Sequence, residues 1–275
     1  MAGALQAIIS PVLQTVSDSH IKRDLVRCFS EHSHYFRTIE EGFRALTRQR
    51  QDPEALCGFF HSWSQTNNSA VTVAGIGNRL TLMLHRGQQV GDERALLRTL
   101  TSLDRIIDED LAVTHRVLHS EMFYRMATDI VGDDRWLLRR YLHPAAKAFK
   151  DWKDHNSLRD RDPVIALLTT LTHEIYTHGE VEFILPLFRR WLDEEYGFTD
   201  AEIRRTLAWI SVHTGPTERD HFFHALSALE HFAEAMDVDI AEYSLDEIVA
   251  TYLAKKAAVL EHLCLSDAIE VEALH

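Results

Sequence analysis

The sequence predicts an all-α protein. Its 275 residues include only 11 glycines and 6 prolines, and the alternation of apolar and polar residues that is typical of β-strands is hard to find. Apolar residues instead recur with the 3.6-residue period of amphipathic helices almost from end to end. Short connections between long helices favour antiparallel neighbours in one bundle. We therefore expect a single helical domain over residues 1–275, with peripheral segments of about 18 residues at the N-terminus and about 10 at the C-terminus.

Turn residues divide the N-terminal half into expected helices. Phe36 and Phe43 lie on the apolar stripe of the first helix. Asp52 as N-cap and Pro53 at the first helical position start the second. Gly132, which is followed by two aspartates, ends the third. The three stretches run approximately over residues 20–48, 53–84 and 93–131.

The C-terminal half is divided in the same way. Asp162 and Pro163 start a long helix. Gly179 and Pro186 should bend it, because a proline inside a helix removes a backbone donor. Thr199 fits the N-cap of the helix that follows. The stretches in this half run approximately over residues 136–152, 163–195, 200–236 and 245–263.

Composition excludes several classes of partner. The net charge of −13 and the lack of a basic run argue against nucleic acid, and no apolar run reaches the roughly 18–20 residues that span a bilayer. No basic residue precedes the apolar N-terminal run, so we expect no signal peptide. Cys28, Cys57 and Cys264 lie far apart, without a Cys-x-x-Cys pair, which fits a reduced cytoplasm. We expect a cytoplasmic protein, and a bundle face could support a homodimer.

Carboxylate and imidazole side chains on three of the expected helices could form one metal-binding pocket. A Glu-x-x-His pair places two side chains about one turn apart on the same helical face. Iron that activates dioxygen is usually held by carboxylates and neutral imidazoles from facing helices, with coordination positions left open. We therefore expect two Fe(II) ions, with O2 as co-substrate. The candidate catalytic and metal-binding residues are Glu109, His119, Glu182, His213, Glu218 and His221.

Two of these spacings require irregular helices. Glu109 and His119 are ten residues apart, which on an ideal helix leaves their directions about 80° apart and some 15 Å along the axis. A break within residues 110–114 is therefore needed to bring both to one metal pair. The five-residue step from His213 to the next candidate carboxylate fits a π-bulge, for which Pro216 and the glycine before it supply a cause.

Each assignment has an alternative. Glu109 belongs to an acidic run and could be a solvated surface residue, and His119 could be a hydrogen-bonded core histidine. Glu182 could pair with an arginine on its own helix while a neighbouring residue points inward. Asp220 and His224, four residues apart on one helical face, form an alternative ligand pair in regular register. The alternative ligands are His178, Glu180, Asp220 and His224.

The order of these groups resembles the heme-oxygenase-like diiron oxidases and oxygenases, a family of seven-helix bundles. Its pattern has an Asn-Leu-x-Asp-Glu-like stretch, then His-Ser-x-Leu-Phe, an inward Glu, and His-x3-Asp-x2-His. The segments of this chain that match these motifs, in the same order, are residues 102–109, 119–123, Glu182 and 213–221. The resemblance as a whole extends from about residue 36 to residue 236. The last motif has one additional residue before its carboxylate, which is Glu instead of Asp.

The resemblance implies a seven-helix bundle and a nonheme diiron oxidase that abstracts a hydrogen from an unactivated carbon. Known activities in the family include desaturation and carbon–carbon cleavage of amino acids or fatty acids, and N-oxygenation. The branch that desaturates an aliphatic amino acid and closes an azetidine ring, in natural product biosynthesis, is nearest. The implied partners are a small amino acid or fatty acid as substrate and an external electron source.

Two other classes compete with this hypothesis. The first is a metal-free enzyme with the same bundle, thiaminase-like or acting in cofactor biosynthesis, which would use Cys, or His and Tyr. Neither Cys57 nor Cys264 has a neighbouring His motif, which argues against a cysteine nucleophile. The second is a helical interaction protein whose polar groups are incidental. Aromatic residues on the candidate helices either line a pocket or belong to an ordinary core. These are Phe123, Tyr124, Trp209 and Phe222.

Overall fold

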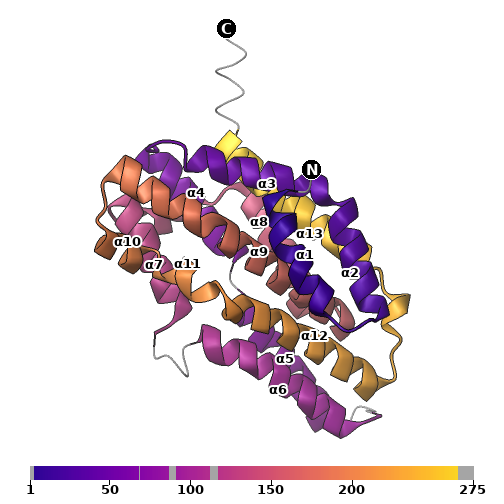
Figure 1. The fold of residues 1–275 in the computed structure, drawn as a ribbon. Helices are drawn as coiled ribbons and strands as arrows, with labels where there is room; N and C mark the ends of the chain where they lie inside the picture. The colour runs from indigo at the N-terminus through magenta and orange to yellow at the C-terminus, as the bar shows by residue number, and fades with distance from the viewer. Residues whose placement is uncertain (1–2, 68, 87–90, 112–116, 266–275) are drawn as a thin grey trace.

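The computed structural model describes residues 3–67, 69–86, 91–111 and 117–265. Within these ranges the chain forms helices and no strand, so the all-α prediction is confirmed (Figure 1). The α-helices are α1 (Ala4–Thr15), α2 (His20–Glu31), α3 (Ser33–Leu46), α4 (Pro53–Thr66), α5 (Ala70–His85), α6 (Glu93–Asp110), α7 (His119–Val131), α8 (Pro144–Asp154), α9 (Pro163–Tyr196), α10 (Asp200–Thr206), α11 (Ala208–His213), α12 (Pro216–Met236) and α13 (Leu245–Leu260). Shorter 3₁₀ or π turns are Arg135–Leu137, Arg139–Tyr141, His155–Arg159, Ile240–Glu242 and Glu261–Leu265.

The described helices outnumber the seven that were expected, because several long stretches are broken. The first breaks at His32, whose backbone (φ −92°, ψ 14°) leaves the helical region and whose Nε2 lies 2.9 Å from Asp246. The second ends at Asn67, whose side chain is held by Lys256 through a 2.8 Å hydrogen bond. Tertiary hydrogen bonds therefore decide where these helices end. The spacing of apolar residues along the sequence carries no information about such long-range bonds.

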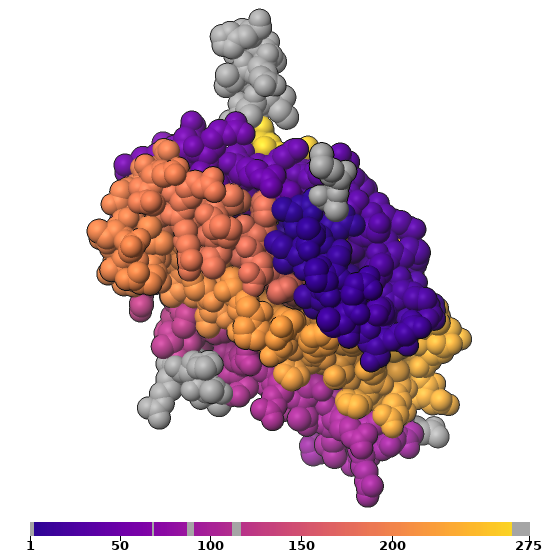
Figure 2. All heavy atoms as spheres, in the orientation of Figure 1, coloured from indigo at the N-terminus to yellow at the C-terminus, as the bar shows by residue number. Residues whose placement is uncertain are grey.

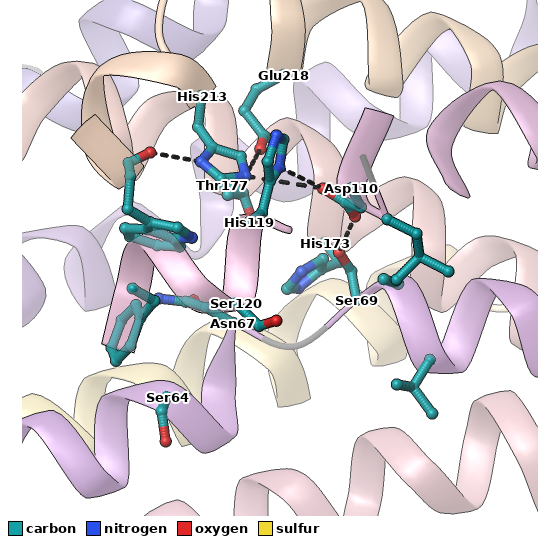
Figure 3. A pocket seen from close by; sticks show the side chains of 15 residues that line it. Ser64, Asn67, Ser69, Asp110, His119, Ser120, His173, Thr177, His213 and Glu218 are labelled. Atoms are coloured by element: carbon teal, nitrogen blue, oxygen red, sulfur yellow. Dashed lines mark hydrogen bonds and ion pairs between the residues drawn. The ribbon is translucent and has the colours of Figure 1, made fainter. Parts of the chain in front are cut away.

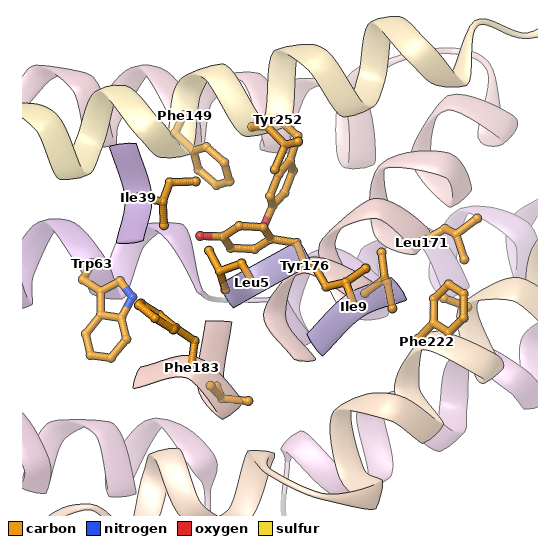
Figure 4. Close-up of a cluster of buried hydrophobic side chains, with 14 of the residues drawn as sticks. Leu5, Ile9, Ile39, Trp63, Phe149, Leu171, Tyr176, Phe183, Phe222 and Tyr252 are labelled. Carbon is orange, nitrogen blue, oxygen red and sulfur yellow. The ribbon is translucent and has the colours of Figure 1, made fainter. Parts of the chain in front are cut away.

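Helix α9 runs through the middle of the bundle. It is continuous through Gly179 and Pro186 and ends at Gly197, which adopts the left-handed conformation (φ 67°) suited to a helix C-terminus. Its side chains are buried on nearly all sides, and Tyr176 and Phe183 belong to the surrounding apolar cluster (Figure 4). Among the described residues, no helix combines the length and the apolar character needed to cross a membrane.

The N-terminal segment, which was expected to be peripheral, contributes to the core. Leu5, Ile9 and Leu13 of α1 are buried, and α1, drawn in indigo, lies against the rest of the bundle in Figures 1 and 2. Glu40 of α3 fixes the start of α1, since its Oε1 accepts the backbone N–H of Leu5 at 2.8 Å. The expected C-terminal periphery falls on residues 266–275, which lie outside the described residues.

Gly179 is the contact point between α1 and α9. A Cβ atom placed there would lie 2.7 Å from Cγ1 of Ile9, closer than packed carbons approach. We expect Gly179→Ala to lower the free energy of unfolding by about 1–3 kcal/mol through overpacking, as measured by urea denaturation. Gly58→Ala in α4 is the control, because no atom lies within 4 Å of its new Cβ. A Gly179→Ala protein as stable as Gly58→Ala would show that α1 does not pack as described.

Candidate metal centre

Two helix interruptions bring the candidate ligands together. Helix α6 ends at Asp110 and α7 begins at His119, so the break that the Glu109–His119 spacing requires is present. The break at the other motif is larger than the predicted π-bulge: α11 ends at His213, and α12 begins only at Pro216. Gly215 between them has φ 70° and ψ −124°, a conformation that residues with a Cβ rarely adopt.

The first group of ligands consists of Asp110, His119 and His213 (Figure 3). Nδ1 of His119 lies 3.0 Å from Oδ1 of Asp110, and Nε2 of His213 lies 3.7 Å from the same oxygen. Ser69 at the start of α5 donates to the other carboxylate oxygen at 3.2 Å. All three ligands are less than one-tenth exposed.

The two histidines of this group each direct one nitrogen inward. Nδ1 of His213 donates its proton to the backbone oxygen of Trp209 at 2.6 Å, which leaves the lone pair of Nε2 facing the carboxylates. A ring nitrogen bonded to a backbone carbonyl in this way is the usual companion of a metal-binding nitrogen. Nε2 of His119 is buried and has no hydrogen-bond partner among the described residues. A cation would satisfy both nitrogens.

The second group consists of Glu174, Glu218 and His221. Nδ1 of His221 lies 3.7 Å from Oε2 of Glu174 and 3.8 Å from Oε2 of Glu218. Glu109 completes the surroundings, with its Oε2 3.2 Å from Nε2 of His221. Two further carboxylate oxygens, Oε1 of Glu174 and Oε2 of Glu218, are buried and lack hydrogen-bond partners within the part of the chain that the structure describes.

Glu218 lies between the two groups. Its Oε1 is 3.7 Å from Nε2 of His213 in the first group, and its Oε2 faces His221 in the second. A carboxylate with its two oxygens directed at two separate sets of ligands can bridge a pair of metal ions. The chain therefore has the donor set for two adjacent cations, each surrounded by oxygen and imidazole nitrogen.

The protonation of these groups reflects their crowding. Burial raises the pKa of Glu218 well above its usual range, and neighbouring carboxylates add to this effect. Burial disfavours ionised Asp110 too, but the surrounding imidazoles of His119, His213 and His221 outweigh this effect and hold the pKa of Asp110 far below normal. The pKa of His221 is raised despite burial, because Glu109 and Glu174 bind its protonated form. Without a metal, protons supply the positive charge of the cluster.

Glu182, the expected ligand on α9, lies outside both groups. It is half-buried, and its Oε1 accepts the backbone N–H of Gly215 at 2.5 Å, so it stabilises the turn before α12. Glu174 contributes the α9 carboxylate instead. The two glutamates are eight residues apart and therefore within about 80° of each other around the helix. Since α9 is buried on nearly all sides between these two residues, periodicity could not separate them.

The remaining candidates fall into two sets. Glu109, His119, His213, Glu218 and His221 are brought together as described. The alternatives are not among the two groups: Asp220 is exposed beside Arg219, His224 is half-buried, His178 is buried elsewhere on α9, and Glu180 pairs with Lys256. Sequence reasoning chose Glu109 from the acidic run and missed its neighbour Asp110, because it assigned residues 110–114 to the required helix break and not to the site.

A cavity of about 240 Å³ adjoins the first group. Its described lining combines small hydroxyl and amide side chains with two aromatic rings, Phe123 and Trp209, and includes no lysine or arginine. Of the other two aromatic candidates, Tyr124 is 42% exposed and Phe222 is buried in the core away from the lining. The polar residues of the lining, apart from the metal-binding candidates and His173, are Ser64, Asn67, Ser69, Ser120 and Thr177.

A second buried polar network lies behind the cavity. Lys256 and Glu180 are fully buried, with Nζ 3.2 Å from Oε2. Glu180 also accepts the indole N–H of Trp63 at 3.0 Å and the hydroxyl of Tyr176 at 2.5 Å. Asn67 links the pair to the cavity, since it accepts from Lys256 and donates to Glu180. This network fixes the end of α4.

Comparison with known proteins supports the fold. Neither a protein-family model nor a curated protein matches the chain. Among solved structures, a TenA homologue from Pseudomonas syringae pv. tomato superposes with a TM-score of 0.65 at 14% identity, over 88% of this chain and 91% of that chain. The shared all-helical fold agrees with the bundle expected from the sequence. At this identity the similarity establishes the fold alone.

Proposed function

We propose that this protein is a nonheme diiron oxidase that uses O2 to oxidise an unactivated C–H bond of a small molecule. The observation that carries the proposal is the position of Glu218 between two buried sets of carboxylate and imidazole ligands. A mixed oxygen and nitrogen donor set without thiolate suits iron or manganese better than softer metals. Helix bundles that hold two metal ions use inward Glu and His side chains from several helices in this way.

The residues present fit two ferrous ions. Asp110, His119 and His213 would hold one, and Glu174 and His221 the other, with Glu218 shared. The fit rests on the buried ligand atoms that lack partners and on the fixed tautomer of His213. Bound there, the ions would supply the electrons that reduce dioxygen, and the external electron source expected from the sequence would restore them.

The cavity favours a small substrate. Its volume of about 240 Å³ accommodates an amino acid more readily than an extended fatty acid. Hydroxyl and amide groups such as Ser120 and Asn67 can orient the polar end, while Phe123 and Trp209 exclude water from the carbon chain. We therefore favour desaturation of an aliphatic amino acid, with cyclisation to an azetidine as a following step. Fatty acid decarboxylation and N-oxygenation are the alternatives.

The test is a comparison of Glu174→Gln with Glu182→Gln. Iron-free protein is titrated anaerobically with Fe(II), and O2 consumption is then followed with a panel of aliphatic amino acids and fatty acids. We expect two iron ions per chain and substrate-dependent O2 consumption in the wild type and in Glu182→Gln, and loss of both in Glu174→Gln. Equal iron binding in the two variants would contradict the proposed ligands. The absence of iron binding under every condition would refute the proposed function.

A second candidate is a metal-free, thiaminase-like enzyme. The shared fold with a TenA homologue favours it. Among the described cavity-lining residues there is no cysteine: Cys28 and Cys57 are buried elsewhere, and Cys264 is half-buried outside the cavity. A metal-free mechanism would therefore depend on His173 or on the carboxylates. Hydrolysis of thiamine by chelator-treated protein would support this candidate and remove the need for iron.

A further inference from the structure

Aromatic rings form a continuous path from the candidate metal centre toward the surface. Trp209 begins it: its ring centroid lies 4.8 Å from that of His213, and its carbonyl holds the same histidine. Trp63 follows, with its centroid 5.3 Å from that of Trp209. We infer that these rings carry one oxidising equivalent away from the centre, to Tyr196, when the centre is oxidised without substrate. The inference rests on the proposed function, which supplies the oxidant.

The outer part of the path runs along α9. Phe188 fills the space between Trp63 and Trp191, with centroid distances of 5.9 and 5.4 Å. Its phenyl ring is hard to oxidise, so the electron passes between the two indoles across it. Tyr196 lies 5.1 Å from Trp191 and is half-buried at the end of α9, where Arg50 packs over its ring at 4.9 Å. The path thus ends where small reductants can reach it.

Trp63 has a proton acceptor in place. Its indole N–H donates to Oε1 of Glu180 at 3.0 Å, and the N–H of an indole becomes strongly acidic once the ring loses an electron. Transfer of the proton to Glu180 therefore makes oxidation of Trp63 easier. Lys256 stabilises the ionised carboxylate that must accept the proton. Figure 4 shows Trp63 and Tyr176, the two rings that donate to this carboxylate. A buried pair of opposite charges is costly in a protein core. Acceptance of the indole proton by Glu180 explains why the Glu180–Lys256 pair lies beside Trp63.

Each transfer moves one electron inward, from ring to ring, toward the centre. Trp209 gives one electron to the oxidised centre and is restored by Trp63, whose indole proton moves to Glu180. Trp191 and then Tyr196 give up the next electrons, and the proton returns from Glu180 to Trp63. The centre gains one electron, and Tyr196 loses one electron and its phenolic proton, which goes to solvent. A low-molecular-weight thiol outside the protein then donates a hydrogen atom to the tyrosyl radical.

Trp63→Phe tests the path, because it keeps an aromatic ring in the core and removes the oxidisable indole. Protein loaded anaerobically with Fe(II) is exposed to O2 without substrate, and oxidised residues are mapped by peptide mass spectrometry. In the wild type we expect oxidation mainly at Trp191 and Tyr196. In Trp63→Phe it should fall there and rise severalfold at Trp209. Trp152→Phe is the control, since Trp152 lies outside this path, against Phe149 and Tyr252. An unchanged map in Trp63→Phe would overturn the inference.

A second measurement needs no iron. Photo-oxidation of iron-free protein should give a larger deprotonated fraction of tryptophan radical in the wild type than in Glu180→Gln/Lys256→Met. The variant lacks the proton acceptor, and because both members of the ion pair are replaced, neither is left as an unpaired buried charge. Equal fractions would refute the role of Glu180. If iron fails to bind or O2 is not consumed, the proposed function fails, and this measurement still decides whether Trp63 and Glu180 form a proton-coupled redox pair.

Discussion

Glu218→Gln should abolish binding of the second iron ion and weaken binding of the first. The two oxygens of Glu218 face different groups of ligands: Oε1 lies 3.7 Å from Nε2 of His213, and Oε2 lies 3.8 Å from Nδ1 of His221. An amide is a weaker donor than a carboxylate and carries no charge to offset the cations. Loss of a residue that only orients a metal ligand costs about 10–100-fold in affinity, so we expect a larger loss here. Anaerobic Fe(II) titration of the variant should give at most one ion per chain.

The same substitution should not destabilise the metal-free protein. Because the pKa of Glu218 is raised by burial, its contribution to stability is fully present below its unfolded pKa and is lost as the pH rises through the folded value. A glutamine of the same shape does not titrate. We therefore expect iron-free Glu218→Gln to be at least as stable as the wild type, with an advantage that grows from pH 6 to pH 8 in thermal unfolding.

Opposite effects on metal binding and on apo stability would separate a ligand from a structural residue. Glu182→Gln is the matched control, since that carboxylate accepts the N–H of Gly215 and lies outside both ligand groups. It should leave iron stoichiometry unchanged while loosening the turn before α12. Loss of metal-free stability in Glu218→Gln, together with normal iron binding, would mean that Glu218 is a structural residue.

The sequence predicted some parts of this centre and not others, for identifiable reasons. The spacing of Glu109 and His119 required a helix break, and the structure has one. The all-α class followed from periodicity, which summarises many residues at once. Periodicity could not distinguish Glu174 from Glu182 as the inward carboxylate, because α9 is buried on nearly all sides and both residues fit the period of an inward-facing position.

Helix ends were the least predictable feature. Continuous helices were expected through His32 and Asn67, where apolar periodicity persists on both sides. In the structure each residue is held by a partner far along the chain, Asp246 or Lys256. These breaks matter for the site, because the end of α4 places Asn67 in the cavity wall and the start of α5 places Ser69 against Asp110. The geometry of the centre thus depends on long-range polar contacts.

Lys256→Met should have the largest effect on stability. Nζ of Lys256 is fully buried and bonds to Thr66 at 3.0 Å, to Asn67 at 2.8 Å and to Glu180 at 3.2 Å. Removal of the cation leaves Glu180 ionised in an apolar core or forces it to take up a proton. Breaking a buried pair in this way costs about 3–5 kcal/mol, which corresponds to a drop of roughly 5–9 °C in Tm for a chain of this size. Differential scanning calorimetry measures it directly.

The double variant Glu180→Gln/Lys256→Met should recover most of this loss. Glutamine can still accept the indole N–H of Trp63, and neither charge of the pair remains, so the desolvation penalty of both ions disappears. Lys147→Met removes an exposed ion pair with Asp151 and should change Tm little. If Lys256→Met and the double variant lost stability equally, the hydrogen bonds of Lys256 to Thr66 and Asn67 would be the stabilising interaction. The pair would then serve mainly to hold the end of α4 against the cavity.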